Sequence, residues 1–283
     1  MTPPETDRAL RAARQTLHTD RLLGVDFVPL RESRRVVARA EQAQASGPDT
    51  QVEPKTVGCA PTIAEAPSAA AHSPSAECAE RREAKRRALE TLRARHDAEC
   101  PHCTAATYHT QTVFGDGNPD ARLMFVGEAP GAEEDRQGIP FVGRAGQKLN
   151  EMIRAMGLAR EDVYIANVLK SRPPENATPT AEEAARCGPY LDAQIAIIRP
   201  QVIVALGKPA MNYLLDTREG INAMRGRWFE YLPRLMDSDL APIPVMPTFH
   251  PAYLLRSYTL ENRQKVWSDL QQVMARLKSL PCA

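Results

Sequence analysis

With 283 residues, the chain is long enough for one large domain or for one domain with an extension. Its 36 lysine and arginine residues nearly balance its 35 aspartate and glutamate residues, so the net charge of +1 is not the overall signature of a nucleic-acid binder. The sequence shows no apolar run of transmembrane length and no N-terminal secretory signal, which predicts a cytoplasmic protein.

The first 78 residues contain two segments of different character. Leucines at roughly helical spacing within residues 7–30 predict a short helical segment in residues 1–40 that cannot form a core alone. Residues 41–78 are rich in Ala, Pro, Ser, Gln and Thr, which predicts a disordered linker. The segment 7–30 would either recruit a protein partner or simply be tolerated, and composition does not separate these two interpretations.

The main domain is expected over residues 79–283. It opens with a highly charged helix at 79–97, for which a solvated face is favoured over a DNA-binding role. Short apolar runs then predict buried strands at residues 123–127, 163–169, 202–207 and 244–250. Helices are predicted at residues 145–156, 180–198, 209–215 and 261–277. This alternation predicts a three-layer α/β/α sandwich around a mostly parallel four-stranded sheet.

Candidate functional residues follow these apolar runs, because ligands bind where the strands of such a sheet end. The first run leads into a glycine-rich stretch, 127–146, that lets backbone N–H groups approach a ligand but matches neither a dinucleotide fingerprint nor a P-loop. Asn167 ends the second run, where its amide would either cap local backbone or read the edge of a base. His250 follows the fourth run, either as a structural residue or as an imidazole presented at the mouth of the sheet.

Four motifs occur in order along the chain: GEAPG, PFVGRAG, NVLKSRPPEN and HPAYLLR. Together they resemble the family 4, iron–sulfur uracil-DNA glycosylases of the uracil-DNA glycosylase superfamily, over about residues 98–275. The resemblance implies a base excision repair hydrolase that flips uracil out of DNA, cleaves its N-glycosidic bond and leaves an abasic site. It also implies a monomer that binds uracil-containing DNA at the nucleoid. A non-catalytic DNA-binding or polymerase-associated module with the same fold is the alternative.

The resemblance assigns roles to the residues at the strand ends. Glu128 and Ala129 would line the site beside the scissile bond, with Glu128 catalytic. Phe141 would stack on the flipped uracil and Asn167 would bind its edge, while His250, the second catalytic residue, would face carbonyl O2. These roles suit a reaction that builds positive charge on the sugar and negative charge on the departing base.

The resemblance also implies a DNA-contacting loop after His250. This loop would enter the minor groove, and its contacts would come from Pro251, Leu254, Leu255 and Arg256. Further basic side chains would either meet phosphates or simply be solvated: Lys148, Lys170, Arg172 and Arg263.

Members of this family hold a 4Fe-4S cluster on four cysteines. Three of the positions are occupied here by Cys100, Cys103 and Cys187, but the remaining one is Ser171, whose hydroxyl is a poorer iron ligand than a thiolate. A substitute ligand would come from Ser171 itself or from His102, Cys59, Cys78 or Cys282. A three-iron or labile cluster, loss of the cluster, and a zinc site remain alternatives. Retention of three ligands favours a structural 4Fe-4S cluster, with no cofactor needed for the chemical step.

Overall fold

The computed structural model describes residues 76–106, 108–234 and 241–281. The predicted helical segment in residues 1–40 and the predicted linker up to residue 75 lie outside the described residues, as do Cys59 and Cys282. Among the described helices, none combines the length and apolar character required to cross a membrane.

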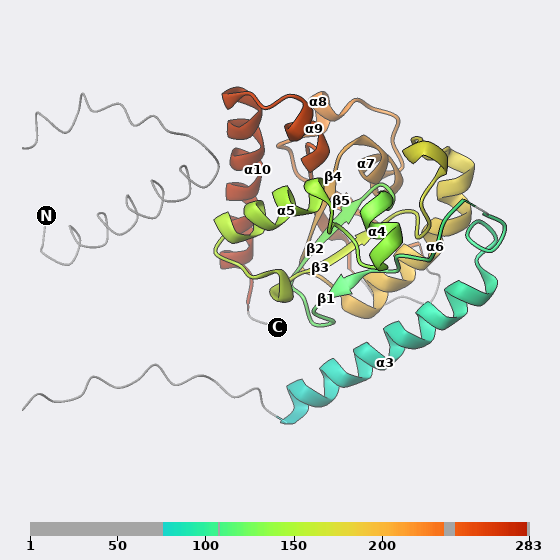
Figure 1. Ribbon diagram of the computed structural model, residues 1–283. Helices are drawn as coiled ribbons and strands as arrows, with labels where there is room; N and C mark the ends of the chain where they lie inside the picture. Colours follow the sequence, from blue (N-terminus) through green and yellow to red (C-terminus); the bar gives the residue numbers. More distant parts are fainter. Residues whose placement is uncertain (1–75, 107, 235–240, 282–283) are drawn as a thin grey trace, which may run out of the picture. The chain divides into compact units, whose positions relative to one another are not determined.

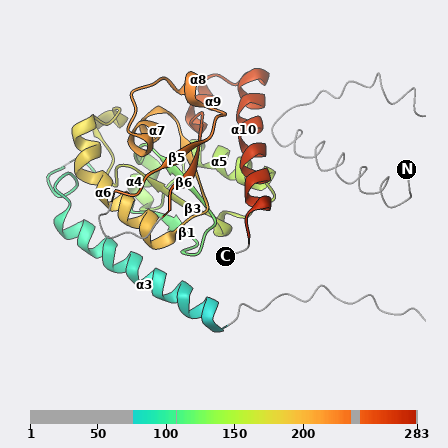
Figure 2. The same ribbon diagram turned by 180° about the vertical axis from the view of Figure 1, so that it is seen from behind.

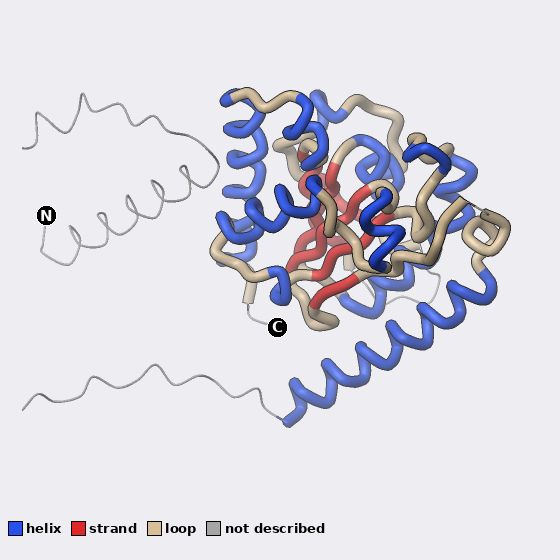
Figure 3. The backbone as a smooth tube through the Cα atoms, in the orientation of Figure 1, coloured by secondary structure: helices blue, strands red, loops and turns tan. Residues whose placement is uncertain are grey.

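A twisted sheet forms the centre of the fold (Figure 3). In the described part of the chain it has six strands in the order β1-β3-β2-β4-β6-β5. Its four central strands are mutually parallel: β3 (Tyr164–Asn167), β2 (Leu123–Gly127), β4 (Val202–Leu206) and β6 (Ile243–Thr248). The edges are the short antiparallel strands β1 (Asp116–Gly117) and β5 (Phe229–Tyr231). The parallel core is as predicted, whereas the four-strand count was too low because the edge strands are too short to form an apolar run.

Helices cover both faces of the sheet (Figures 1 and 2). One face packs against α5 (Arg144–Ala155) and α10 (Leu260–Ser279). The other packs against α6 (Ala181–Ile198) and α7 (Lys208–Leu215), and α3 (Ala76–Glu99) lies along α6. Successive residues of β2 alternate between the two cores, and all of them are buried, as expected for a strand covered on both sides. This arrangement confirms the predicted α/β/α sandwich.

The helix after His250 corrects one sequence-based expectation. Residues Pro251 to Arg256, expected to be a loop, form helix α9 (Pro251–Arg256). His250 Nδ1 accepts a hydrogen bond from the Ala252 N–H at 3.1 Å, and Pro251 occupies the first helical turn, where its missing N–H costs nothing.

Other short helices also lie in segments where none was predicted. They are α4 (Ala132–Gln137), η1 (Arg160–Asp162), η2 (Pro174–Asn176) and α8 (Ile221–Met224). In addition, α3 starts at Ala76, so the last three residues of the expected linker, 76–78, belong to that helix.

Candidate active site and metal site

A pocket of about 270 Å³ opens at the carboxyl ends of β2, β3 and β6. The structure brings together here six of the residues singled out in the sequence: Glu128, Ala129, Phe141, Asn167, His250 and Arg256. They come from segments up to 128 positions apart, and parallel strand order places them at one edge. The pocket therefore lies where the strand-end rule predicts it.

The glycine-rich turn is held by a carboxylate that the sequence analysis did not single out. Glu134 Oε1 accepts hydrogen bonds from the backbone N–H groups of Val142 and Gly143, both at 2.9 Å. These bonds fix the turn that carries Phe141, whose backbone adopts a left-handed φ of 52°. Such a conformation costs a non-glycine residue free energy and persists only where surrounding contacts impose it. Its sequence signal was a run of three acidic residues, 133–135, directly after the first motif.

Asn167 lies at the floor of the pocket with only 1% of its surface exposed. Its Oδ1 atom has no hydrogen-bond partner among the described residues. A buried amide oxygen left unpaired costs roughly 1–3 kcal/mol, which a bound donor would recover. The atom is therefore a candidate recognition group for a ligand that enters the pocket.

His250 presents a neutral imidazole to the same pocket. Burial lowers its pKa to about 4, and the nearby charge of Arg256 acts in the same direction. Because Nδ1 accepts the Ala252 N–H, the ring proton resides on Nε2. The ring centroid lies 5.6 Å from that of Phe141. The side chain is thus prepared to donate one hydrogen bond without carrying a charge.

Glu128 completes the polar groups of the pocket. Burial raises the pKa of this carboxyl, while a hydrogen bond from Thr178 and the positive charge of Arg256 oppose the shift. Two carboxylates therefore line the pocket: Glu134 is occupied by the backbone of the glycine-rich turn, and Glu128 lies in the same pocket as the neutral donor His250.

The residues expected to contact DNA divide into two sets. Pro251 and Leu254 are buried, and Leu254 belongs to the core beneath α9. Leu255 and Arg256 are exposed, and Tyr258, which was not predicted, is 50% exposed beside them. Only this second set reaches the surface.

The other basic candidates differ from one another in burial and in the groups that they contact. Lys170 is fully buried, and its Nζ donates to Asn167 O at 2.8 Å and to Gln194 Oε1 at 2.6 Å, so neither alternative considered for it, phosphate contact or surface solvation, describes its position. Arg263 and Lys148 both lie over the Tyr258 ring, with their charged groups 4.6 and 5.1 Å from its centroid. Two cationic side chains thus lie over the Tyr258 ring, next to the exposed end of α9.

A second group of side chains converges beside the first helix of the domain. His96, Cys100, Cys103 and Cys187 are all buried, and their ligand atoms lie within 4.8 Å of one another. Three thiols and one imidazole are the donor set of a thiophilic metal centre, either zinc or iron–sulfur. The group can hold a metal, and His96 is a member that the sequence analysis missed. Its only signal was its position one helical turn before Cys100.

Of the substitute ligands that the structure describes, Cys78 and His102 are not in this group. Cys78 lies on α3 18 positions before His96, about 27 Å along the helix. His102 does not belong to the cluster, although it neighbours Cys103 in sequence. Ser171 is fully buried, and its Oγ makes no hydrogen bond within the described chain.

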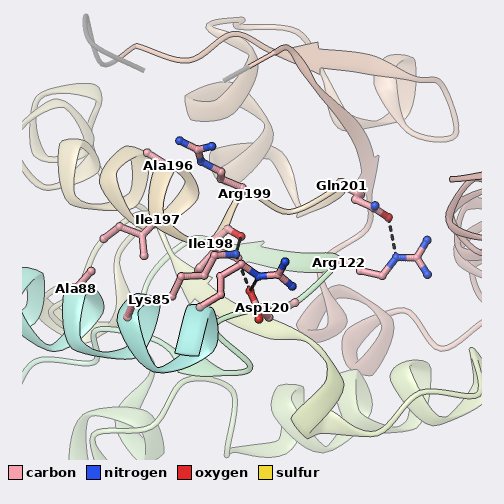
Figure 4. Close-up of a pocket in the computed structure, with 12 residues that line it drawn as sticks. Lys85, Ala88, Asp120, Arg122, Ala196, Ile197, Ile198, Arg199 and Gln201 are labelled. Carbon is pink, nitrogen blue, oxygen red and sulfur yellow. Dashed lines mark hydrogen bonds and ion pairs between the residues drawn. The ribbon is translucent and has the colours of Figure 1, made fainter. Parts of the chain in front are cut away.

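A larger cavity, of about 570 Å³, lies between α3 and α6 near the residues that precede β2 and β4 (Figure 4). Its polar groups bind one another: Lys85 Nζ lies 2.7 Å from Asp120 Oδ1, and Arg122 Nε donates to Gln201 Oε1 at 2.7 Å. None of the predicted site residues lines it. We therefore assign the candidate active site to the smaller pocket.

Comparison with known proteins relates the chain to one group. The model of the uracil DNA glycosylase superfamily matches residues 114–271. A type-4 uracil-DNA glycosylase of Thermotoga maritima is 48% identical over 180 residues, which span 62% of this chain and 90% of that protein. A type-4 uracil-DNA glycosylase of Archaeoglobus fulgidus is 41% identical over 178 residues, spanning 62% and 86% of the two chains. A DNA polymerase of Bacillus phage SP01 is 28% identical over 154 residues, 54% of this chain but only 16% of the polymerase.

Proposed function

This chain belongs to the uracil DNA glycosylase superfamily, and we propose that it excises uracil from DNA in the pocket at the ends of β2, β3 and β6. The membership confirms the family predicted from the four sequence motifs. The observation that carries the assignment of the site is the convergence of Glu128, Phe141, Asn167 and His250 on one pocket. The enzyme is a hydrolase of N-glycosyl bonds that acts in DNA repair.

Recognition of the base rests on Asn167 and Phe141. A base inside a duplex is out of reach, so the nucleotide rotates out of the stack and enters the pocket, where the Phe141 ring replaces part of the lost stacking. The unpartnered Oδ1 of Asn167 accepts uracil N3–H, and its amide N–H donates to O4. Cytosine presents the reverse pattern at these two positions. With cytosine in the pocket, the buried amide groups of Asn167 would lack hydrogen-bond partners, and this penalty discriminates uracil from cytosine.

Cleavage of the glycosidic bond rests on His250 and Glu128. Negative charge develops on uracil as the bond breaks, and the Nε2–H of His250 donates to carbonyl O2 to stabilise that charge. A neutral donor suits this role because its hydrogen bond to O2 strengthens as negative charge develops there, which favours the transition state over the bound substrate. Positive charge develops on the sugar, and the Glu128 carboxylate supplies the opposite sign on the other side of the bond.

The DNA surface proposed here extends from the pocket along the exposed end of α9. Leu255 is 40% exposed and would enter the space that the flipped nucleotide leaves, while Arg256 would meet a phosphate. Tyr258 and Arg263 continue this surface. We further propose that the chain acts as a monomer, because the groups assigned to recognition and cleavage are all its own, and that it acts at the nucleoid in the cytoplasm, where its DNA substrate lies.

The metal group supports a second part of the proposed function. We propose that residues 79–283 form the glycosylase domain and that Cys100, Cys103 and Cys187 hold a 4Fe-4S cluster in it. A cluster bound there would link the end of α3 to α6 and would stabilise the intervening chain. The excision residues are separate from this group and act without it.

A uracil-containing oligonucleotide tests the proposed activity. Excision is read as alkali-labile strand breaks, with wild type beside Glu128→Ala, Asn167→Ala and His250→Ala. The wild type is expected to excise uracil, and each variant is expected to lose most of the rate while keeping its thermal unfolding transition. Glu219→Ala, a change at an exposed residue that does not line the pocket, is the matched control. A folded wild type that binds the oligonucleotide without cleaving it would instead establish the non-catalytic DNA-binding module.

A further inference from the structure

We propose that His96 is the fourth ligand of the metal site, replacing the cysteine that is absent at position 171. This assignment deepens the metal part of the proposed function and is independent of the excision chemistry. It gives the site a Cys3His ligand set in which helix α3 contributes the imidazole.

The distances in the group are those between ligands of one centre. His96 Nε2 lies 3.2 Å from Cys103 Sγ and 4.0 Å from Cys187 Sγ, and the two sulfur atoms are 3.7 Å apart. Ligands of a single tetrahedral zinc ion would be about 3.8 Å apart for two sulfurs and about 3.6 Å for sulfur and nitrogen. The imidazole therefore occupies a ligand's position relative to the thiols. An iron–sulfur cluster would bind the same four donors with wider spacing, because each ligand sits on a different iron.

The ring of His96 is oriented by contacts on its other sides. Nδ1 lies 2.9 Å from Asp97 Oδ1, and that carboxylate oxygen also accepts a hydrogen bond from Thr112 Oγ1 at 2.7 Å. A histidine that binds metal through one nitrogen commonly uses the other to bind a carboxylate, which fixes both the tautomer and the ring direction. Tyr190 packs edge-on against the ring at a centroid distance of 4.8 Å. These contacts hold Nε2 toward the thiols.

Helical spacing places His96 beside the first cysteine of the group. His96 and Cys100 are four positions apart, so both project from the same side of the helix end. The Cys100 N–H donates to His96 O at 2.9 Å, which continues the helical hydrogen-bond pattern to the first cysteine. His96 is completely buried, although it belongs to one of the most highly charged segments of the chain. A buried imidazole in such a helix needs a specific partner, and the three thiols provide it.

Ser171 is close to the site but is a poor candidate for the ligand. The N–H of the preceding residue, Lys170, donates to Cys187 Sγ at 3.3 Å, so this part of the backbone borders the group. No hydrogen bond joins the Ser171 Oγ to any of the three thiols, whereas His96 Nε2 contacts two of them. A serine hydroxyl also retains its proton at neutral pH, whereas neutral imidazole is a ready metal ligand. The chain has therefore exchanged a ligand from the loop after β3 for one from α3.

Metal content of full-length variants tests the assignment. Zinc, iron and acid-labile sulfide are measured in wild type, His96→Ala and Ser171→Ala, all purified without oxygen. We expect wild type and Ser171→Ala to carry equal amounts of metal and His96→Ala to lose most of it. The double variant His96→Ala/Ser171→Cys should regain metal, because a thiol then returns at position 171. Full metal in His96→Ala together with loss in Ser171→Ala would overturn the assignment.

A conservative variant covers the case in which His96→Ala does not fold. His96→Cys keeps four ligands, so metal should be retained while nitrogen coordination disappears. Nitrogen coordination is read by pulsed electron paramagnetic resonance if iron is present, and by X-ray absorption at the zinc edge if zinc is present. A nitrogen signal in wild type that is lost in His96→Cys supports the assignment, and an identical signal in both refutes it. Zinc in place of iron and sulfide would reject the cluster while leaving the ligand assignment intact.

Discussion

Gly127 is the position at which the geometry of the pocket can be disturbed most directly. It ends β2, and a Cβ atom placed there would lie 2.5 Å from Phe141 Cζ and closer still to Asn167 Oδ1. Ordinary contacts at a Cβ begin near 3.4 Å, so Gly127→Ala must displace the ring and the amide by about 1 Å. Misplacement of this size costs roughly a hundredfold in rate. Overpacking of the same contacts should lower stability by about 1–3 kcal/mol.

Single-turnover excision and thermal unfolding measure these two effects separately. Gly127→Ala is expected to be folded, with a melting temperature lowered by about 2–4 °C for each kcal/mol, and to excise uracil far more slowly than wild type. Gly220→Ala is the matched control, because a Cβ there meets no described atom within 4 Å and the backbone φ is −79°. A wild-type rate in Gly127→Ala would show that Asn167 and Phe141 do not set the geometry of the reacting base.

Four further predictions follow from the charges of the fold. Because burial holds the pKa of His250 near 4, the pH–rate profile should show no ionisation of this residue near pH 6.5. As pH falls, the rate should decline first as the Glu128 carboxylate, whose pKa burial raises, is protonated, and further as His250 is protonated near pH 4. Arg225→Met leaves Asp269 buried without its cation and should destabilise the fold by roughly 3–5 kcal/mol, read as a lowered melting temperature. Burial raises the pKa of Asp269 from its ordinary value of 3.8 to about 6 in the folded protein, so the folded state binds this proton more tightly than the unfolded state. The stability that protonation of this group contributes should therefore be fully present below about pH 4 and lost as pH rises through about 6, and Asp269→Asn should remove this pH dependence. Arg256→Gln should weaken binding to a uracil oligonucleotide and reduce the slope of log affinity against log salt by about 1, measured by fluorescence anisotropy; an unchanged slope would exclude a phosphate contact.

The central sheet could be predicted because its strands are buried on both faces. Runs such as LMFVG and VIVAL have no polar position, and their ends coincide with the observed strands to within a few residues. The edge strands β1 and β5 have two and three residues, and tertiary pairing rather than local composition makes them strands. Helix α9 was missed for a related reason: its start depends on the side chain of His250, which accepts the Ala252 N–H as a helix cap, and the sequence alone did not indicate this cap.

The active site was more predictable than the metal site. Asn167 and His250 each end a parallel strand, and parallel order alone brings such residues to one edge. The fourth member of the metal group follows no such rule. His96 meets Cys187 across 91 positions because α3 packs on α6, and no periodicity in the charged helix reveals that contact. A histidine one turn before a C-x-x-C pair is the pattern that would have indicated it.

The segment after β3 connects the two sites and explains why a change of ligand can leave recognition intact. Lys170 binds Cys187 Sγ through its backbone N–H, and its buried Nζ binds both Asn167 O and Gln194 Oε1. The backbone that carries the recognition amide is thus tied to α6 by side-chain hydrogen bonds as well as by its proximity to the metal group. A cysteine at position 171 would add a further tie, but its absence leaves the bonds of Lys170 in place. Because those bonds already fix Asn167, the proposed transfer of one metal ligand from this segment to α3 would preserve the position of the amide that we propose reads uracil.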